Sequence, residues 1–584
     1  MKLIKHIIIF LAISFFLSCN DSDYLLRTPE TNITEPSFWK TTNDLKIFVN
    51  QFYNTLPKIG GYDQGLYDDD GRSDNMIYEN YDIRLAGLTT IPNTGSVLNY
   101  SNIRSVNYFL EKGSQLDILD IEKDQANAYL GEGYFFRAWY YFDLLLKYGG
   151  VPWIDKVLTT SSPELFSPRE DRSVIVDYIL KDLDTAISYL RPAVDAETDR
   201  LSKEVALALK SRVALFEGTW EKYHNNTPFA AKTSNSQKYL QIALEASNDI
   251  IVGKYGKIYS IHTTGDPDQD YFNLFNQDDL SSNSEIIFWA KYRFELGTGH
   301  NLQRYTGITY PHPTKSLIDS YLCVNGHPIS NSNGLYQGDD LPFDIYENRD
   351  PRLKQITFVK GDPRTIEGND TLVTFEKGTI HLSGNLRSPT GFNFKKGLTP
   401  NNNSGCQQVD FTSNTAIIYF RYAEILLNYV EAKAELGTLT QADVDLTINK
   451  IRDRVNMAHL NISNIVNDPN WDFPELSPVM NEIRRERRNE LACEGFRLND
   501  ILRWRAHHLI SGQKPLGIKF DQSMYPELTP GVNIHLSSDG YVDPYAISLP
   551  NGWGFKPDRD YLLPLSKEEL TLNPNLVQNP GWIE

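Results

Sequence analysis

The sequence contains little cysteine, and the positions of the few cysteines exclude two kinds of cross-link. Only four of the 584 residues are cysteine, namely Cys19, Cys323, Cys406 and Cys493, and no C-x-x-C pair occurs. Beyond Cys19 an odd number remains at wide spacings. We therefore expect neither a disulfide framework nor a zinc site.

Other signatures of metal and enzyme sites are missing or incomplete. Acidic residues alternate along residues 266–270 as in a calcium loop, but Tyr271 replaces the required glycine and Gln277 the closing glutamate. The chain has no G-x-S-x-G elbow, no H-E-x-x-H and no phosphate loop. We therefore predict that the protein is not an enzyme, has no catalytic residues, and needs no metal or cofactor.

The acidic and basic residues around Glu490 have two possible interpretations. Paired carboxylates such as Glu490 and Glu494 can act as acid and base in glycoside hydrolysis. On a helix, however, Arg487 lies three residues before Glu490 and Arg497 three residues after Glu494, and such neighbours keep carboxylates ionised. The segment therefore predicts a structural ion-pair network with these arginines as local partners.

Long apolar runs are also absent. The apolar run at residues 7–17 is too short to cross a bilayer as a helix; it follows Lys2 and Lys5 and closely precedes Cys19. This arrangement predicts a lipoprotein signal peptide over residues 1–18 and a mature chain that carries acyl chains on the Cys19 thiol. A simple secretory peptide is the alternative.

Basic residues are too few to balance the acidic ones. The chain has 57 lysines and arginines against 75 aspartates and glutamates, a net charge of −18. Such a chain repels phosphate backbones, so we expect no nucleic-acid ligand. Aromatic residues make up 12% of the chain, and tyrosine outnumbers phenylalanine by 33 to 28. Rings with a hydroxyl suit the recognition of partly apolar, hydroxylated ligands.

Apolar residues recur at helical spacing and predict a mainly α protein. Over residues 415–436 they alternate at spacings of four and three, Gly437 ends the stripe, and Thr440 can cap a second helix that reaches Val455. The turn between the two helices implies a hairpin. Repeated hairpins predict a tetratricopeptide-like scaffold, with an ordinary helical bundle as the alternative. Similar stripes cover residues 175–190, 205–220 and 239–251.

Residues 124–148 predict a helix of a different kind. Its second half is rich in aromatic side chains and leucine and has hardly any polar face, so we expect it to be buried on nearly all sides. Arg137 and Asp143 would then need buried partners. Gly149 ends the helix.

Segments rich in glycine, proline, asparagine, aspartate and tyrosine alternate with the helices. They contain short β-like runs such as residues 285–292, and we expect them to hold the ligand. No low-complexity linker divides the chain, so one composite domain and two domains both remain open. We assign the helical scaffold to about residues 35–255 and 412–510. The loop-rich ligand-binding portions cover about residues 60–100 and 256–411, and the C-terminal loop region covers residues 511–584.

Three longer motifs are similar to those of a known family. They are YFFRAWYYFDLLLKYGGVPW at residues 134–153, RRERRNELACEGFRLNDILRW at residues 484–504, and the segment of residues 563–582 that contains LPLS and NPNLVQNPGW. Together with Cys19 they resemble the SusD/RagB family. The motifs extend to the end of the chain, so the resemblance implies a single domain over residues 19–584.

The resemblance implies a cell-surface lipoprotein that binds a nutrient, usually a glycan, and sits as a lid on a TonB-dependent outer-membrane transporter similar to SusC. It implies paired helices, loop-rich binding segments and no catalysis. Asp21 and Asp23, close behind Cys19, resemble a signal for the outer leaflet of the outer membrane, facing the extracellular side. A RagB-like peptide binder and, less favoured, a surface glycoside hydrolase are the alternatives.

Two loops combine aromatic rings with polar groups, as glycan recognition requires, because sugars have apolar C–H faces and hydroxyl rims. The early loop covers residues 67–84 and the mid-chain loop residues 289–310. In SusD-like proteins the loop region before the early helices and a mid-chain region commonly meet at the ligand. The predicted ligand-binding residues are Arg72, Asp74, Tyr78, Tyr81, Arg84, Trp289, Tyr292, Asn301, Tyr305 and Tyr310. The aromatic rings that would stack on sugars are Tyr78, Tyr81, Trp289 and Tyr292. The polar side chains that would bind hydroxyl groups are Arg72, Asp74, Arg84 and Asn301.

Overall fold

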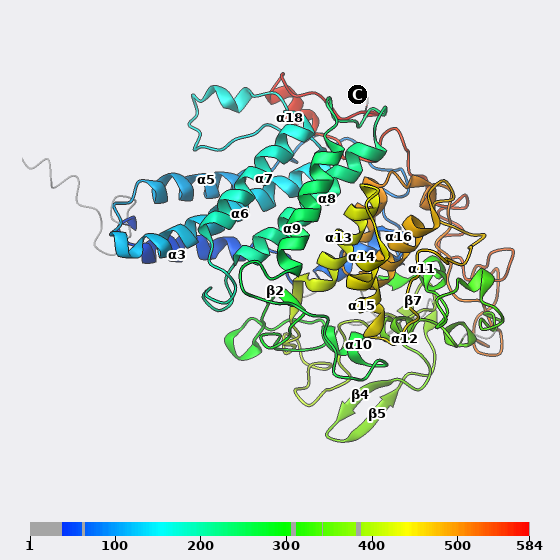
Figure 1. Ribbon diagram of the computed structural model, residues 1–584. Helices are drawn as coiled ribbons and strands as arrows, with labels where there is room; N and C mark the ends of the chain where they lie inside the picture. Colours follow the sequence, from blue (N-terminus) through cyan, green and yellow to red (C-terminus); the bar gives the residue numbers. More distant parts are fainter. Residues whose placement is uncertain (1–37, 61–64, 305–310, 341–342, 381–386, 583–584) are drawn as a thin grey trace, which may run out of the picture.

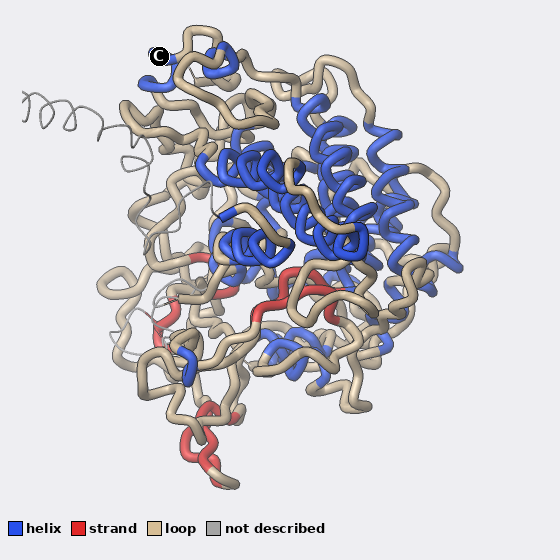
Figure 2. The backbone as a smooth tube through the Cα atoms, turned by 90° about the vertical axis from the view of Figure 1, so that its left-hand side faces the viewer, coloured by secondary structure: helices blue, strands red, loops and turns tan. Residues whose placement is uncertain are grey.

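The protein is described by a computed structural model that covers residues 38–60, 65–304, 311–340, 343–380 and 387–582. Figure 1 shows long helices gathered in one part of the molecule and loops with short strands in the other. The quarter-turn view in Figure 2 shows the strands lying among the loops. The helices and the few two-stranded pairs confirm the predicted mainly α fold.

The early helices form the scaffold. Helices α6 to α9 pack against one another in chain order, and α5 packs on both α3 and α6 (Figure 1). This arrangement confirms the apolar stripes and the scaffold of paired helices that the sequence predicts. The bounds are α3 (Thr42–Tyr53), α5 (Ser101–Ser114), α6 (Lys123–Tyr148), α7 (Arg172–Tyr189), α8 (Lys203–Tyr223) and α9 (Ser236–Ile251).

Helix α6 is buried along most of its length, as its aromatic sequence predicts. Arg137 has the buried partner that it needs, because its Nε and Nη2 each donate to Asp182 of α7 at 2.7 Å. For Asp143 the prediction is wrong. Its side chain is about half exposed and pairs with Lys147 one turn later, so it lies on the narrow face of α6 that meets solvent.

The sequence predicted one helix over residues 415–436. The structure instead has a strand followed by a helix. Strand β8 (Ile417–Arg421) precedes α13 (Tyr422–Glu435) and pairs antiparallel with β2 (Ile286–Ala290). The apolar spacing is ambiguous over so short a segment, and the β-branched and aromatic residues of β8 find a partner strand. Strand β2 lies within the predicted β-like run. Helix α13 ends before Gly437, whose φ of +72° suits glycine.

The second helix of this hairpin is interrupted. Thr440 caps it as predicted, but α14 (Gln441–Leu446) stops at Thr447, and α15 (Ile448–Asp453) follows. Thr447 has φ −122° and ψ −88°, outside the helical region, and its hydroxyl donates to a carbonyl one turn earlier. Apolar residues from both pieces still pack with α13 in a small second core.

The predicted ion-pair network is confirmed, but its partners come from distant segments. Helix α16 (Pro478–Glu490) ends at Glu490, so residues on either side of this point share no helix. Arg497 binds Asp74 at 2.7 Å, and Arg487 binds Asp500 at 2.9 Å. The predicted local pairs are therefore wrong, because partners from other segments occupy these arginines.

Glu490 lies at the centre of the network. It accepts hydrogen bonds from Arg352, Arg421 and Arg454 at 2.6 to 2.9 Å. Burial alone would raise the pKa of Glu490, but the guanidinium groups, Arg454 foremost, hold that pKa well below its usual range. The carboxylate therefore stays ionised and is unsuited to act as a general acid. Arg421 also binds Glu494, so the network links α16, α13 and the loop-rich half.

Short elements complete the fold. Strand β1 pairs with β3, β4 with β5, and β6 with β7, and the β4–β5 hairpin projects from the body at the bottom of Figure 1. The strands are β1 (Met76–Ile77), β3 (His312–Pro313), β4 (Pro363–Glu367), β5 (Asp370–Thr374), β6 (Thr379–Ile380) and β7 (Arg387–Ser388). The short helices are α4 (Leu66–Asp69), α10 (Asp270–Phe275), α11 (Lys315–Ser320), α12 (Pro351–Ile356), α17 (Arg497–Arg503) and α18 (Lys567–Leu572).

Candidate functional site

The two loops that the sequence predicts as ligand-binding are brought near one another by contacts at their ends. The backbone N–H of Asn301 donates to the Gly60 carbonyl at 3.2 Å, and that of Ile59 donates to the Tyr292 hydroxyl at 3.1 Å. Strand β1 of the early loop also pairs with β3, which follows the mid-chain loop. Segments more than 200 residues apart in the sequence therefore lie next to one another.

Several of the predicted ligand-binding side chains are used inside the protein. Both carboxylate oxygens of Asp74 accept from Arg497, at 2.7 and 2.8 Å. Asn301 accepts from the backbone N–H of Phe411 at 2.5 Å, and Tyr292 is buried with its hydroxyl bound as described above. A buried polar group needs such partners, so these three side chains position the loops.

The remaining described residues of the predicted set differ in exposure. Arg84 is half-buried and donates to two carbonyls of the C-terminal loop region at 2.9 Å. Burial lowers the pKa of Arg84 to about 10. Arg72 is exposed, and Tyr78, Tyr81 and Trp289 are half-buried. These four side chains are at least partly accessible to solvent.

Five residues named from the sequence lie outside the described residues. They are Tyr305 and Tyr310 of the mid-chain loop and Cys19, Asp21 and Asp23 of the predicted anchor. Their roles stay predictions.

A polar groove lies between residues 276–279 and the segment of residues 399–415, with Gln303 of the mid-chain loop in its wall. Its volume is about 420 Å³, and amide, hydroxyl and carboxylate groups line most of it. We call it the polar groove; residues that line it include Asn276, Asp278, Asp279, Asn401, Asn403 and Asn414. Such groups bind the hydroxyls of a ligand in defined directions.

Aromatic rings lie beside the polar groove. Phe294 and Phe411 are 38% and 53% exposed, and the backbone N–H of Phe294 donates to Asn414 of the groove at 2.8 Å. Lys291 connects Trp289 to the groove. Its ammonium pairs with Asp279 of the groove and lies 5.9 Å from the Trp289 ring centroid. Flat apolar faces and polar groups therefore occur together here.

The two carboxyl groups of the groove differ in ionisation. Burial, and secondly the charge of Glu295, raises the pKa of Asp278 above its ordinary value. The hydrogen bond from Lys291 holds the pKa of Asp279 well below its usual range. The groove thus contains one firmly ionised carboxylate, neutralised by a lysine, and one that takes up a proton more readily.

A second pocket adjoins the polar groove at the base of the β4–β5 hairpin. It has a volume of about 280 Å³, and we call it the arginine pocket because Arg304 and Arg364 line it. Gln303 and Thr399 line both spaces. The Gln303 side chain is fixed, since its nitrogen donates to Gly397 O and its oxygen accepts from Thr399 N, both at 2.9 Å. The two spaces therefore share a rigid wall.

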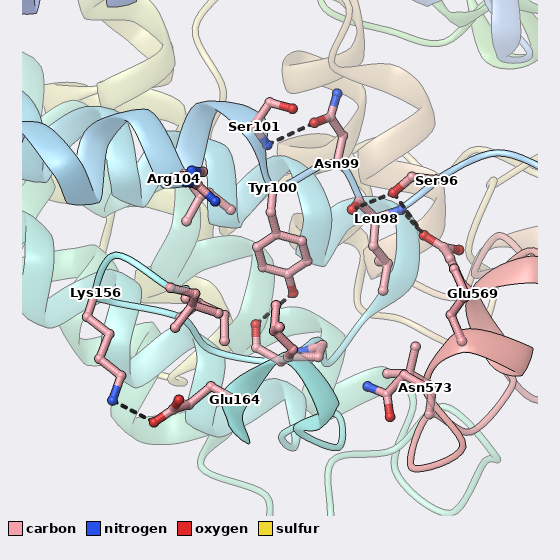
Figure 3. A pocket seen from close by; sticks show the side chains of 17 residues that line it. Ser96, Leu98, Asn99, Tyr100, Ser101, Arg104, Lys156, Glu164, Glu569 and Asn573 are labelled. Atoms are coloured by element: carbon pink, nitrogen blue, oxygen red, sulfur yellow. Dashed lines mark hydrogen bonds and ion pairs between the residues drawn. The ribbon is translucent and has the colours of Figure 1, made fainter. Parts of the chain in front are cut away.

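A larger pocket, of about 600 Å³, lies at the other end of the helical scaffold, between the start of α5 and α18 (Figure 3). Its walls are largely aliphatic. Two of its polar groups are bound within the protein: the Tyr100 hydroxyl donates to the Pro152 carbonyl, and Glu569 accepts from the Leu98 N–H, both at 2.7 Å. It therefore fits a hydroxylated ligand less well than the polar groove does.

Sequence reasoning missed Phe294, Phe411 and the asparagines of the groove. Phe294 and Asn414 are bonded across 120 positions of sequence, a contact that no local spacing reveals. The asparagine-rich run at residues 401–403 is the signal that could have directed attention to this segment.

Within the described residues no helix is long and apolar enough to cross a bilayer. The same residues contain no group of three or more histidine, cysteine, aspartate or glutamate side chains arranged to hold a metal ion.

Comparisons with known proteins agree across the chain. The family model described as the SusD family matches residues 276–582, and the one described as starch-binding associating with outer membrane matches residues 39–215. Two SusD-like proteins of Formosa agariphila are similar in sequence. One is 26% identical over 86% of this chain and 92% of its own length, and the other is 23% identical over 99% and 100%.

Solved structures show the same fold. A SusD-like carbohydrate-binding protein of Bacteroides fragilis has a TM-score of 0.70 at 22% identity, covering 93% of this chain and 100% of its own. A second SusD-like protein of that species has a TM-score of 0.68 at 24% identity, covering 95% and 100%. A laminarin-binding SusD-like protein has a TM-score of 0.56 at 18% identity, covering 93% and 100%.

Proposed function

The chain belongs to the SusD family, and from this premise we propose that it is a cell-surface lipoprotein that captures an oligosaccharide or polysaccharide and delivers it to a TonB-dependent transporter similar to SusC. The family descriptions support carbohydrate binding and association with the outer membrane. The observation that carries the proposal is the polar groove with exposed aromatic rings beside it.

The geometry of the groove suits a sugar chain. A pyranose ring has C–H faces that stack on aromatic rings and a rim of hydroxyls that both donate and accept hydrogen bonds. Trp289, Phe294 and Phe411 supply the faces, and the amides and carboxylates of the groove supply the hydrogen bonds. Its volume of about 420 Å³ lies within the usual range for ligand pockets.

The early loop extends this surface. Arg72 is exposed and Tyr78 and Tyr81 are half-buried, and these side chains would contact further sugar units. The buried members of the predicted set hold the two loops in register, so their contribution to binding is positional. A surface built from both loops suits a chain of several units better than a single sugar.

Capture and delivery require the protein to stay at the membrane. Acyl chains on Cys19 would provide that attachment, because each buried CH₂ adds about 0.8 kcal/mol. A ligand surface that faces the transporter would pass the glycan on without releasing it to bulk water.

A combined array of glycans and peptides tests the function. We expect the mature chain to bind glycans, to ignore peptides, and to leave oligosaccharide lengths unchanged after a day of incubation. Binding to peptides alone would favour the RagB-like alternative. Turnover that a single carboxylate substitution abolishes would establish a glycoside hydrolase instead.

A further inference from the structure

The arginine pocket contains a cation that the protein itself does not neutralise. Arg364 lies on β4, is half-buried, and has no carboxylate within 4.0 Å among the described residues. Its Nε is enclosed and has no hydrogen-bond partner in the part of the chain that the structure describes. Burial lowers the pKa of Arg364, with no nearby charge to oppose it.

The other arginine of the pocket is neutralised by an ion pair, so Arg364 supplies the pocket's uncompensated charge. Arg304 lies 2.7 Å from Asp410, and about a third of its side chain and half of that of Asp410 remain exposed. The residues that line the pocket include both arginines and no aspartate or glutamate. The local charge thus opposes the net charge of −18 of the whole chain.

The backbone that carries Arg364 is held firmly. The Gln407 side-chain nitrogen donates to the Arg364 carbonyl at 2.9 Å, and the Gln407 oxygen accepts from Thr365 at 2.7 Å. The guanidinium lies over the ring of Phe358, with its carbon 5.6 Å from the centroid. A planar group fixed in this way is suited to bind an anion through two parallel hydrogen bonds.

The remaining walls suit a sugar that carries the anion. Phe272, Phe358 and Leu398 provide apolar surface, and Thr365 and Thr399 provide hydroxyls. The volume of about 280 Å³ is close to the lower limit for small-ligand pockets, which matches one sugar unit better than a longer piece. Gln303 and Thr399 line both spaces, so the polar groove is near enough to receive a neighbouring unit of the same chain.

We propose that the arginine pocket is a subsite for an anionic sugar unit, with Arg364 binding its sulfate ester or carboxylate while a neighbouring unit occupies the polar groove. This subsite rests on the proposed function, since it presumes that the protein binds glycans. It defines the substrate class as acidic polysaccharide. The polar groove contains carboxyl groups and no arginine, so we expect the unit next to the anionic one to be neutral.

Matched pairs of oligosaccharides test the subsite by calorimetry. The probes are sulfated galactan oligosaccharides before and after desulfation, and uronate oligosaccharides before and after reduction of the carboxyl groups. We expect the wild type to bind at least one anionic member about tenfold more tightly than its neutral counterpart, with affinity that falls as NaCl rises. The two pairs distinguish a sulfate ester from a carboxylate.

Two variants assign the effect to the pocket. Arg364→Gln should lose the preference for the anionic member and its salt dependence while keeping affinity for the neutral one. Arg104→Gln, an exposed arginine at the other end of the scaffold, should behave as wild type. Equal binding of both members of each pair, or an unaltered preference in Arg364→Gln, would overturn the subsite and leave glycan binding intact. Failure to bind any glycan would overturn both proposals.

Discussion

At the scale of single residues, the buried carboxylate of Glu490 should contribute strongly to stability. In Glu490→Gln, the guanidinium groups of Arg352, Arg421 and Arg454 lose their common carboxylate in a buried site. We expect the free energy of unfolding to fall by about 3–5 kcal/mol. Urea denaturation measures it. Glu111→Gln, on the exposed face of α5, should change it by less than about 0.5 kcal/mol, and equal losses in both variants would contradict the central role of Glu490.

Glu221 should make stability depend on pH. This residue of α8 is buried, and burial together with the charge of Glu217 raises its pKa from 4.5 to about 8. Between these values the folded protein keeps a proton that the unfolded chain has lost, so stability should fall as pH rises from about 5 to 8. Glu221→Gln removes this contribution. Urea denaturation at pH 5 and pH 8 should show a smaller loss in the variant; equal losses would contradict the assignment.

At the scale of elements, the polar groove depends on the contact between the turn at residues 294–299 and the segment at residues 411–415. His300 and Ser413 form an antiparallel bridge there, with N–H···O distances of 3.0 and 3.2 Å. A Cβ at Gly299 would come within 2.1 Å of the Phe411 carbonyl oxygen. Gly299→Ala should therefore separate the two segments, lower the free energy of unfolding by about 1–3 kcal/mol and weaken glycan binding.

Gly297→Ala is the matched control for this prediction. Gly297 has φ +73°, and a Cβ added there would meet no other atom within 4 Å, so alanine strains the backbone without touching Phe411. It should lower stability and leave glycan affinity near that of the wild type. Equal affinity losses in the two variants would show that turn strain, and not the contact with Phe411, governs the groove.

Sequence patterns predicted the elements better than their boundaries. The stripes of α7, α8 and α9 are long enough to fix a helical period, whereas the five residues of β8 satisfy either period. The break at Thr447 depends on a side-chain hydrogen bond, and hydroxyl residues are too common to predict one. Asp143 is one polar residue among aromatic ones and lies on the exposed edge of α6. The sequence pattern could not distinguish this position from a buried ion pair.

The candidate site was predictable by region rather than by residue. Trp289 belongs to a segment that composition marks as ligand-binding, and its ring lies near Lys291, which pairs with Asp279 of the groove. Asp74 and Asn301 have the same polar character, but their partners Arg497 and Phe411 are more than 100 residues away. Exposed and buried polar groups look alike in the sequence until those partners are known.

At the scale of the whole molecule, attachment should depend on one residue that precedes the described fold. Cys19→Ala should leave the melting temperature of the protein unchanged, because Cys19 would be the terminal residue of the mature chain. It should release the protein from the membrane fraction, since no acyl chain can then be added. Fractionation of cells followed by detection of the chain measures the distribution. An unchanged membrane fraction would contradict lipidation at Cys19.

Calorimetric titration of a glycan into Trp289→Ala tests the central claim, glycan capture at the polar groove, most directly. Loss of this ring should cost about 1–3 kcal/mol, roughly a tenfold loss of affinity, without a change in folding. Trp471→Ala serves as the control, because Trp471 is also half-buried but stacks with Arg485, away from the groove. Undiminished affinity in Trp289→Ala, and likewise in Phe294→Ala and Phe411→Ala, would contradict the account.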